Sequence, residues 1–346
     1  MNLAELNKIA EAMVAPGRGI LAADESTGTI KKRFDALGVE STPDTRRDYR
    51  EMLFRSTEAM AKNISGVILY DETIRQTARD GTPLVKLIEK AGSLPGIKVD
   101  KGTKPLPFHP GELITEGLDG LRERLVEYRG LGAKFAKWRA VIDIGQSTSG
   151  DAIPSYACIL TNAHALARYA ALCQDENIVP IVEPEVLMDG DHDIDRCAEI
   201  SEWVLKTTFE QLYYQSVALE GMVLKPNMAV PGKKSGKRAS VAEVAEKTLR
   251  LLKQCVPAAV PGIAFLSGGQ SDEEATAHLD AINKLGELPW RVTFSYGRAL
   301  QHAPQQAWSG RSENVAAAQR AFGHRAMMNG LATMGQWKAD LERKAA

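Results

Sequence analysis

Short apolar runs alternate regularly with longer amphipathic stretches along this chain. Eight runs have the length and composition of buried strands, and they lie at residues 19–24, 66–70, 96–100, 135–142, 179–185, 222–227, 262–269 and 292–297. The stretches between them have the spacing of helices, for example at residues 117–131, 154–176, 193–215, 240–255 and 271–284. Strands that alternate with helices pair in parallel and are buried on both faces, which explains the continuous apolar runs.

Eight strand–helix units predict a single-domain α/β protein with the TIM (β/α)8-barrel fold over residues 1–346. An open doubly wound sheet is the alternative that the pattern leaves open. No G-x-G-x-x-G turn follows the first run, which disfavours a dinucleotide-binding fold. Residues 1–18 are expected to form an N-terminal helix and lead-in, and residues 329–346 a short C-terminal tail.

The charge balance and the cysteines limit the possible partners and compartment. Lysine plus arginine number 43 against 44 aspartates and glutamates, so no positive excess predicts binding to nucleic acid or to an acidic membrane. No run approaches the roughly 20 apolar residues that span a bilayer, and the N-terminal stretch has a helical period that does not fit a signal or transit peptide. The scattered cysteines fit reduced thiols in a cytoplasmic protein.

Charged and small polar residues interrupt or end these apolar runs, although burying an unpaired charge is costly. They are Asp24, Asp100, Lys101, Lys137, Arg139, Glu183, Glu185, Lys225 and the segments 267–269 and 295–298. Residues i and i+2 of a strand share a face, so Lys137 projects with Arg139, and Glu183 with Glu185. Ion pairs filling polar layers of the barrel are the alternative explanation for any one of them. Their clustering at the carboxyl ends of the strands, where barrel active sites lie, favours a functional site.

Two lysines compete as the nucleophile of this site. Lys225 follows an apolar run and precedes Pro226, which ends the strand. Burial beside the cations of the fourth run favours the neutral amine, the form that attacks a carbonyl carbon. Lys137 is the competing candidate, and spacing alone does not choose between the two.

The last two runs end in small residues suited to a phosphate. SGGQS at 267–271 and SYGR at 295–298 offer backbone N–H groups that a phosphate can approach, and a helix N-terminus follows each. Arg298 adds a charge-assisted clamp. Phosphate sites of α/β barrels commonly lie at these two strands, so the residues alone predict a barrel that handles a phosphosugar.

The histidines do not favour metal chemistry. The six of them show no H-x-H or H-x-x-x-H spacing, which a zinc-dependent enzyme needs, so no metal or other cofactor is expected. The acidic run DGDHD at 189–193 and the basic run GKKSGKR at 232–238 are both expected to be solvated loops.

Seven strings give the chain a recognisable signature. They are GILAADEST (19–27), GIKVDKG (96–102), FAKWR (135–139), IVEPE (181–185), LKPNM (224–228), FLSGGQS (265–271) and FSYGRAL (294–300). In order and spacing they resemble class I fructose-bisphosphate aldolase, in its shorter bacterial-type form without a C-terminal tyrosine. The resemblance implies a lyase of glycolysis and gluconeogenesis. Such an enzyme reversibly cleaves fructose 1,6-bisphosphate to dihydroxyacetone phosphate and glyceraldehyde 3-phosphate, through a lysine Schiff base and without a metal.

Carried over position by position, the resemblance implies a role for each charged residue of the site. Lys225 becomes the Schiff-base lysine that attacks the C2 ketone. Glu183 becomes the general acid and base for carbinolamine formation and dehydration, and Glu185 holds the amine. Asp24 lies beside the C4 hydroxyl and assists C3–C4 cleavage, while Lys137 transfers protons and binds hydroxyls.

The resemblance also implies where the anionic groups bind. The C1-phosphate site is expected to contain Ser267, Gly268, Ser295, Gly297 and Arg298. Arg139 is expected to bind an anionic group, and Arg33 and Lys101 to lie near the C6-phosphate end and the amine pocket.

Several alternatives accompany this resemblance. No tyrosine follows Tyr296, whereas animal members end in one that assists proton exchange, so the preference for the bisphosphate over fructose 1-phosphate is open. Sedoheptulose 1,7-bisphosphate would suit the same site. A non-catalytic barrel scaffold would lack at least one of Lys225, Glu183 and Asp24, and all three are present. By analogy with the family, the protein is expected to be a homotetramer.

Overall fold

The computed structural model describes residues 1–345, and its centre is one closed sheet of eight parallel strands. The strands are β1 (Gly19–Ala23), β2 (Ile64–Leu69), β3 (Leu94–Lys98), β6 (Phe135–Ile142), β9 (Val179–Val186), β10 (Val223–Leu224), β11 (Gly262–Phe265) and β12 (Arg291–Tyr296). Their order around the barrel is β1-β12-β11-β10-β9-β6-β3-β2. The predicted (β/α)8 barrel is thus confirmed, and the open sheet is excluded because β1 pairs with both β2 and β12.

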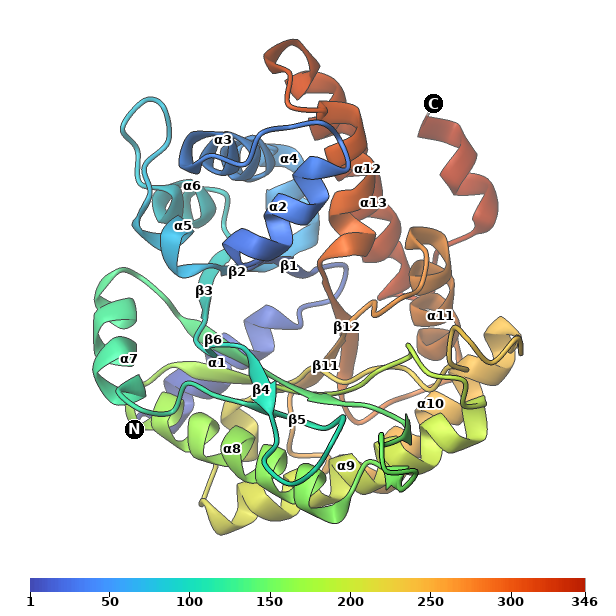
Figure 1. Ribbon diagram of the computed structural model, residues 1–346. Helices are drawn as coiled ribbons and strands as arrows, with labels where there is room; N and C mark the ends of the chain where they lie inside the picture. Colours follow the sequence, from blue (N-terminus) through green and yellow to red (C-terminus); the bar gives the residue numbers. More distant parts are fainter. Residues whose placement is uncertain (346) are drawn as a thin grey trace.

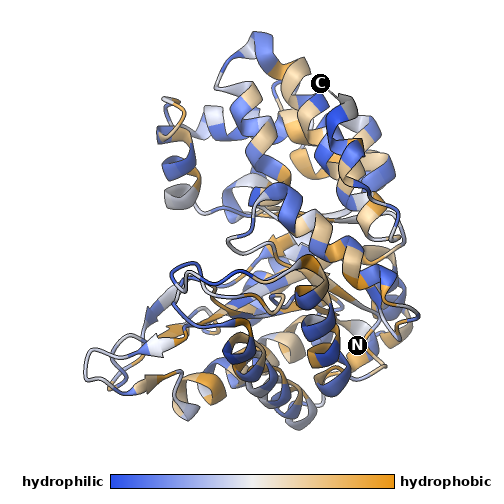
Figure 2. Cartoon of the chain, turned by 90° about the vertical axis from the view of Figure 1, so that its right-hand side faces the viewer, coloured by the Kyte–Doolittle hydropathy of each residue, from blue (hydrophilic) through white to orange (hydrophobic). Residues whose placement is uncertain are grey.

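Helices surround the barrel (Figure 1). They are α1 (Leu3–Met13), α2 (Thr27–Asp35), α3 (Pro43–Phe54), α4 (Thr57–Asn63), α5 (Asp71–Arg75), α6 (Leu84–Lys90), α7 (Leu121–Gly130), α8 (Tyr156–Asp175), α9 (Ile194–Tyr214), α10 (Val241–Cys255), α11 (Asp272–Lys284), α12 (Arg298–Trp308) and α13 (Val315–Ala332), with 3-10 turns η1 (Leu219–Gly221), η2 (Ser312–Asn314) and η3 (Ala339–Ala345). Figure 2 shows apolar segments concentrated along the strands and on the helix faces turned toward them. No described helix is both long and apolar enough to cross a membrane.

The N-terminal helix closes one end of the barrel. Leu6, Ala10 and Met13 of α1 are fully buried and pack against barrel residues such as Phe135 and Val223. Full burial of such an apolar side chain contributes about 1.5–3 kcal/mol. Helix α1 therefore seals the amino-terminal end of the strands, and the carboxyl ends are left for a site.

Two short antiparallel hairpins follow strands β3 and β6 at the carboxyl end of the barrel. Strands β4 (Thr103–Pro105) and β5 (Leu113–Thr115) form one, and β7 (Gly145–Gln146) and β8 (Ala152–Ile153) form the other. Neither hairpin was expected from the apolar runs, because both consist mainly of exposed or half-exposed residues.

The observed ends of several strands and helices differ from the expected ones at prolines and glycines, which set the local backbone conformation. Strand β10, the sixth strand of the barrel along the chain, is only two residues long, because Pro226 has no backbone N–H to continue the hydrogen-bond ladder. Helix α7 starts at Leu121, after Gly117 and Gly120 in backbone conformations with positive φ. The expected C-terminal tail is partly ordered structure, since α13 continues to Ala332 and η3 follows.

Candidate active site

Four charged side chains form a buried chain of ion pairs at the carboxyl ends of the strands. Lys225 Nζ lies 3.0 Å from Glu183 Oε1, and Lys137 Nζ lies 2.9 Å from Glu183 Oε2. Lys137 Nζ also donates to Asp24 Oδ2 at 3.2 Å. Asp24, the most exposed of the four side chains, is only 13% exposed. The structure thus brings together residues 24, 137, 183 and 225, as expected from their strand positions.

The backbone fixes where these side chains point. Strands β6 and β9 pair in a register that places Arg139 opposite Glu183. The Lys225 N–H donates to Val182 O at 2.8 Å, which extends the pairing of β10 with β9 by one residue. Asn227 then anchors the chain, because its side-chain oxygen accepts from Val186 N–H and its amide nitrogen donates to Ser201.

The electrostatics of the cluster favour charged forms for three of its members. Burial alone would raise the pKa of Asp24, but the positive charges of Lys137 and Lys225 outweigh it and hold this pKa well below its usual range. The same cations lower the pKa of Glu183 despite its burial. Burial opposes the charge of Lys137, yet Asp24 and Glu183 raise its pKa well above the ordinary value. Lys137 is therefore held as an ammonium between two carboxylates.

Arg139 and Glu185 form a second pair on the same strands. Arg139 Nε donates to Glu185 Oε2 at 2.5 Å, and the Arg139 side chain is 41% exposed whereas that of Glu185 is 8% exposed. Burial is outweighed by the charge of Glu185, which raises the pKa of Arg139. Glu185 thus contacts Arg139, and among the described residues it forms no ion pair with Lys225.

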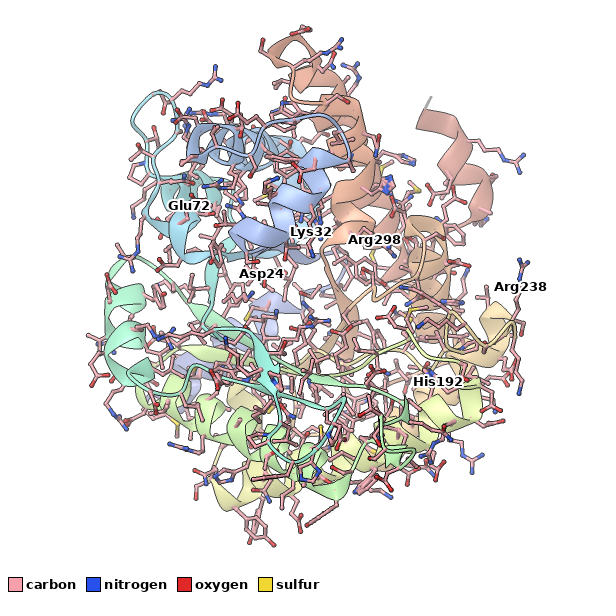
Figure 3. All side chains as sticks on the ribbon, in the orientation of Figure 1. Asp24, Lys32, Glu72, His192, Arg238 and Arg298 are labelled. Carbon is pink, nitrogen blue, oxygen red and sulfur yellow. The ribbon has the colours of Figure 1, made fainter. Side chains whose placement is uncertain are left out.

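The predicted phosphate-binding residues gather at the ends of β11 and β12. Gly268 has a φ of +53°, and the Arg298 guanidinium donates to Gln270 O at 2.6 Å beside it. Ser295 is 1% exposed, and its hydroxyl has no hydrogen-bond partner among the described residues. Figure 3 shows Arg298 near the middle of the barrel view, to the right of Asp24.

The two helix N-termini at this site are not equivalent. Ser271 and Glu274 form a capping box that already satisfies the first turn of α11. Gly297 precedes α12, whose N-terminus receives no side-chain cap. The first turn of α12 therefore has more free backbone N–H groups to bind an anion than the first turn of α11.

Arg33 is held in place by a buried carboxylate. Its Nη1 donates to Glu25 at 2.5 Å, and its side chain is 27% exposed. A Cβ built on Gly297 would lie 4.0 Å from Arg33 Nη2, so Arg33 lies beside the residues assigned to the C1 phosphate. Gln301 donates to the same Glu25 oxygen at 2.7 Å and helps to fix the pair.

Lys101 is exposed, and nearby Lys98 was not among the predicted site residues. Among the described residues, neither Asp24 nor Asp100 forms an ion pair with Lys101. Lys98 lies 3.9 Å from Asp100 and is one of the cations that lower the pKa of Asp24. The rule that selected Lys137, a charge inside an apolar run, would also have found Lys98. No such signal marks Glu25, which lies just outside the apolar run that ends at Asp24.

A closed parallel barrel with a buried lysine–carboxylate cluster at the carboxyl ends of its strands defines this chain as a (β/α)8-barrel enzyme. No described group of three or more histidines, cysteines, aspartates or glutamates is arranged to hold a metal ion. Comparison with known proteins identifies the particular kind of enzyme.

The family model "Fructose-bisphosphate aldolase class-I" matches residues 5–346. The chain is 56% identical over 339 residues to a probable fructose-bisphosphate aldolase class 1 of Xanthomonas campestris pv. campestris, covering 98% of this chain and 100% of that protein. It is 52% identical over 336 residues to the fructose-bisphosphate aldolase of Drosophila melanogaster, covering 97% and 91%. A solved structure of fructose-bisphosphate aldolase from Plasmodium falciparum, in complex with TRAP and a small-molecule inhibitor, matches with a TM-score of 0.94 and 47% identity, covering 97% and 96%.

The chain therefore belongs to the class I fructose-bisphosphate aldolases. These lyases reversibly cleave fructose 1,6-bisphosphate to dihydroxyacetone phosphate and glyceraldehyde 3-phosphate, a step of glycolysis. The family resemblance inferred from the seven strings and the enzyme class that it implied are both confirmed.

Proposed function

We propose that this aldolase uses Lys225 as its Schiff-base lysine and Glu183 as the proton-transfer group beside it. The observation that carries the proposal is the 3.0 Å separation of Lys225 Nζ and Glu183 Oε1 in a buried pair. Lys137 is the weaker nucleophile, because two carboxylates raise its pKa and keep it protonated. Membership of class I implies that the reaction runs without a metal.

The cleavage reaction can be followed through the four clustered residues. Glu183 accepts a proton from the Lys225 nitrogen, and the resulting amine attacks the C2 ketone. A second nitrogen proton moves to the carbinolamine oxygen, Glu183 returns the first one to it, and this oxygen leaves as water to give the protonated imine. Asp24 accepts the C4 hydroxyl proton while the C3–C4 bond breaks. The electron pair of that bond flows into the protonated imine, giving an enamine and free glyceraldehyde 3-phosphate. The ammonium of Lys137 stabilises both carboxylates and binds substrate hydroxyls.

The remaining site residues bind the ends of the substrate. The C1 phosphate meets the backbone of Gly268 and Gly297, the uncapped first turn of α12 and the Arg298 guanidinium. Ser267 and the unpartnered hydroxyl of Ser295 complete this end of the site. Arg33 supports the C1 end from beside Gly297, whereas Lys101 belongs to the C6 end and Arg139 binds an anionic substrate group.

A homotetramer in the cytoplasm, acting on a phosphosugar and on neither nucleic acid nor membrane, is part of the same proposal. The charge balance of the chain, 43 basic against 44 acidic residues, supports the exclusion of nucleic acid. Membership of the family supports the substrate class.

A cleavage assay with and without EDTA tests this function. The wild-type chain is expected to cleave fructose 1,6-bisphosphate at the same rate in EDTA, and faster at low concentration than fructose 1-phosphate or sedoheptulose 1,7-bisphosphate. Lys225→Met is expected to lose at least about 10³-fold in kcat. The matched control is Lys62→Met, a lysine that is 69% exposed on α4, and it should retain full activity. Loss of activity in EDTA, or an active Lys225→Met enzyme, contradicts the proposal.

A further inference from the structure

The basic run at 232–238 is not a free loop where it begins. Gly232 N–H donates to His192 O, Lys233 N–H to Met188 O and Lys234 N–H to Gly190 O, at 2.8, 2.8 and 2.9 Å. A Cβ at Gly232 would lie 2.2 Å from Gly190 O, so only glycine permits this close approach. The expected solvated loop thus has exposed side chains at Lys233 and Lys234, but the backbone of residues 232–234 is fixed to the segment that follows β9.

This anchoring places the Lys233 side chain over the glycine loop that follows β11. A Cβ built on Gly269 would lie 1.9 Å from Lys233 Cε and 2.3 Å from Lys233 Nζ. The ammonium thus lies directly above the backbone of Gly269, the residue next to Gly268 of the phosphate loop. Its ion-pair partner is Asp189, at 2.9 Å, and both side chains are about half exposed.

The backbone beneath Lys233 has an N–H group with only a weak acceptor. Gly269 N–H donates to the thioether of Met188 at 2.9 Å, and a thioether is a poor hydrogen-bond acceptor. Gly269 also lines two cavities, one of about 730 Å³ with Arg298 and one of about 610 Å³ with Lys233. Arg298 and Lys233 therefore both line cavities that Gly269 borders.

We propose that Lys233 is a further substrate-binding residue of this aldolase. When substrate binds, the Lys233 side chain breaks its ion pair with Asp189 and contacts the C1 phosphate held by the Gly268–Gly269 loop. The inference rests on the proposed placement of the C1 phosphate. An exposed lysine–aspartate pair contributes little stability, whereas a phosphate dianion forms stronger charge-assisted hydrogen bonds. Only the side chain has to move, because the backbone at residue 233 is already fixed.

The rest of the basic run does not share this position. Lys237 pairs with Asp193 at 3.1 Å and its side chain is 63% exposed. Figure 3 shows Arg238 at the right-hand edge of the view, away from Arg298. Lys237 is therefore a matched control on the same loop.

The condensation direction separates the two ends of the substrate, because dihydroxyacetone phosphate carries only the C1 phosphate. Lys233→Gln is expected to raise the KM for dihydroxyacetone phosphate about tenfold, with the KM for glyceraldehyde 3-phosphate and kcat changed less than about twofold. Lys233→Arg should recover most of the loss, and Lys237→Gln should match the wild type. Asp189→Asn should lower the KM for dihydroxyacetone phosphate, since it removes the competing carboxylate.

Inorganic phosphate titrated into the full-length protein by calorimetry tests the lysine apart from the chemistry. Weaker phosphate binding by Lys233→Gln, with unchanged binding by Lys237→Gln, supports the inference even where Schiff-base formation is not measured. An unchanged KM for dihydroxyacetone phosphate in Lys233→Gln, or equal losses for both substrates, overturns it. Absence of a Schiff base in the wild type would instead overturn the proposed function.

Discussion

Lys225 Nζ and Glu183 Oε1 lie 3.0 Å apart, with side chains that are 4% and 3% exposed. The other oxygen of Glu183 lies 2.9 Å from Lys137, so one carboxylate contacts two lysine side chains. In this arrangement Glu183 holds Lys225 in position and is near enough to exchange a proton with a group bound to it. Lys137 also pairs with a second carboxylate, that of Asp24. Among the described ion pairs, Lys225 pairs with Glu183 alone.

Replacing Glu183 by glutamine is expected to lower kcat by about 10²–10⁴-fold, since the amide keeps the shape but transfers no proton. The change also leaves Lys137 and Lys225 facing each other without their shared carboxylate, which costs about 3–5 kcal/mol of folding free energy. Single-turnover kinetics and thermal unfolding measure the two effects separately. A folded Glu183→Gln enzyme with wild-type kcat would remove Glu183 from the mechanism.

Substitution of the two lysines is expected to have different chemical consequences. Lys137→Met should still form a covalent adduct with dihydroxyacetone phosphate but should cleave fructose 1,6-bisphosphate about 10²-fold or more slowly, because a stabilising charge is lost. Lys225→Met should form no adduct at all. Mass spectrometry after borohydride reduction reports the adduct, and a steady-state assay reports cleavage. The opposite pattern would exchange the assignments of the two lysines.

The dependence of stability on pH is expected to depend partly on Asp24. Its pKa is lower in the folded protein than in the unfolded chain. The carboxylate therefore contributes its full stabilisation above about pH 4 and loses it as the pH falls toward the folded-state pKa. Asp24→Asn should be less stable than the wild type by more than about 1 kcal/mol at pH 7, and this difference should shrink below pH 4. Denaturant unfolding at several pH values measures it, and a difference independent of pH contradicts the assignment.

The C-terminal η3 turn is expected to be held to α13 by Glu342. This carboxylate accepts from the buried Arg325 at 2.6 Å, from Trp337 Nε1 at 2.9 Å and from the ring of His324 at 2.9 Å. Glu342→Ala leaves Arg325 without its carboxylate and should cost about 1–3 kcal/mol. Hydrogen exchange of residues 333–345 should become faster, whereas the exposed control Glu287→Ala should leave it unchanged. Equal exchange in the two variants would show that Glu342 does not hold the segment.

Much of the fold was predictable, because the barrel strands are the most apolar segments of the chain. Strand β6 was predicted with its observed ends, Phe135 and Ile142. The helices between residues 27 and 90 were predicted without bounds, since highly charged helices such as α3 show little apolar periodicity. Hairpin β4–β5 was missed for a related reason, because the exposed residues of β4 show no alternating pattern.

The site was predictable wherever a charge breaks an apolar strand, as at Lys137, Glu183 and Lys225. The placement of Arg33 was not predictable from the sequence. It depends on Glu25 and Gln301, which come from different elements and meet only in the folded structure. Lys233 illustrates the same limit. A charge run in a sequence has the signature of a solvated loop, and only the backbone contacts of residues 232–234 show where it is fixed.

The location of the covalent adduct decides whether Lys225 is the Schiff-base lysine. The protein is incubated with dihydroxyacetone phosphate, reduced with borohydride, digested and analysed by mass spectrometry, with an EDTA-treated sample alongside. We expect one reduced adduct, on Lys225, at equal yield in both samples. An adduct on Lys137, or no adduct together with activity that EDTA abolishes, would contradict it.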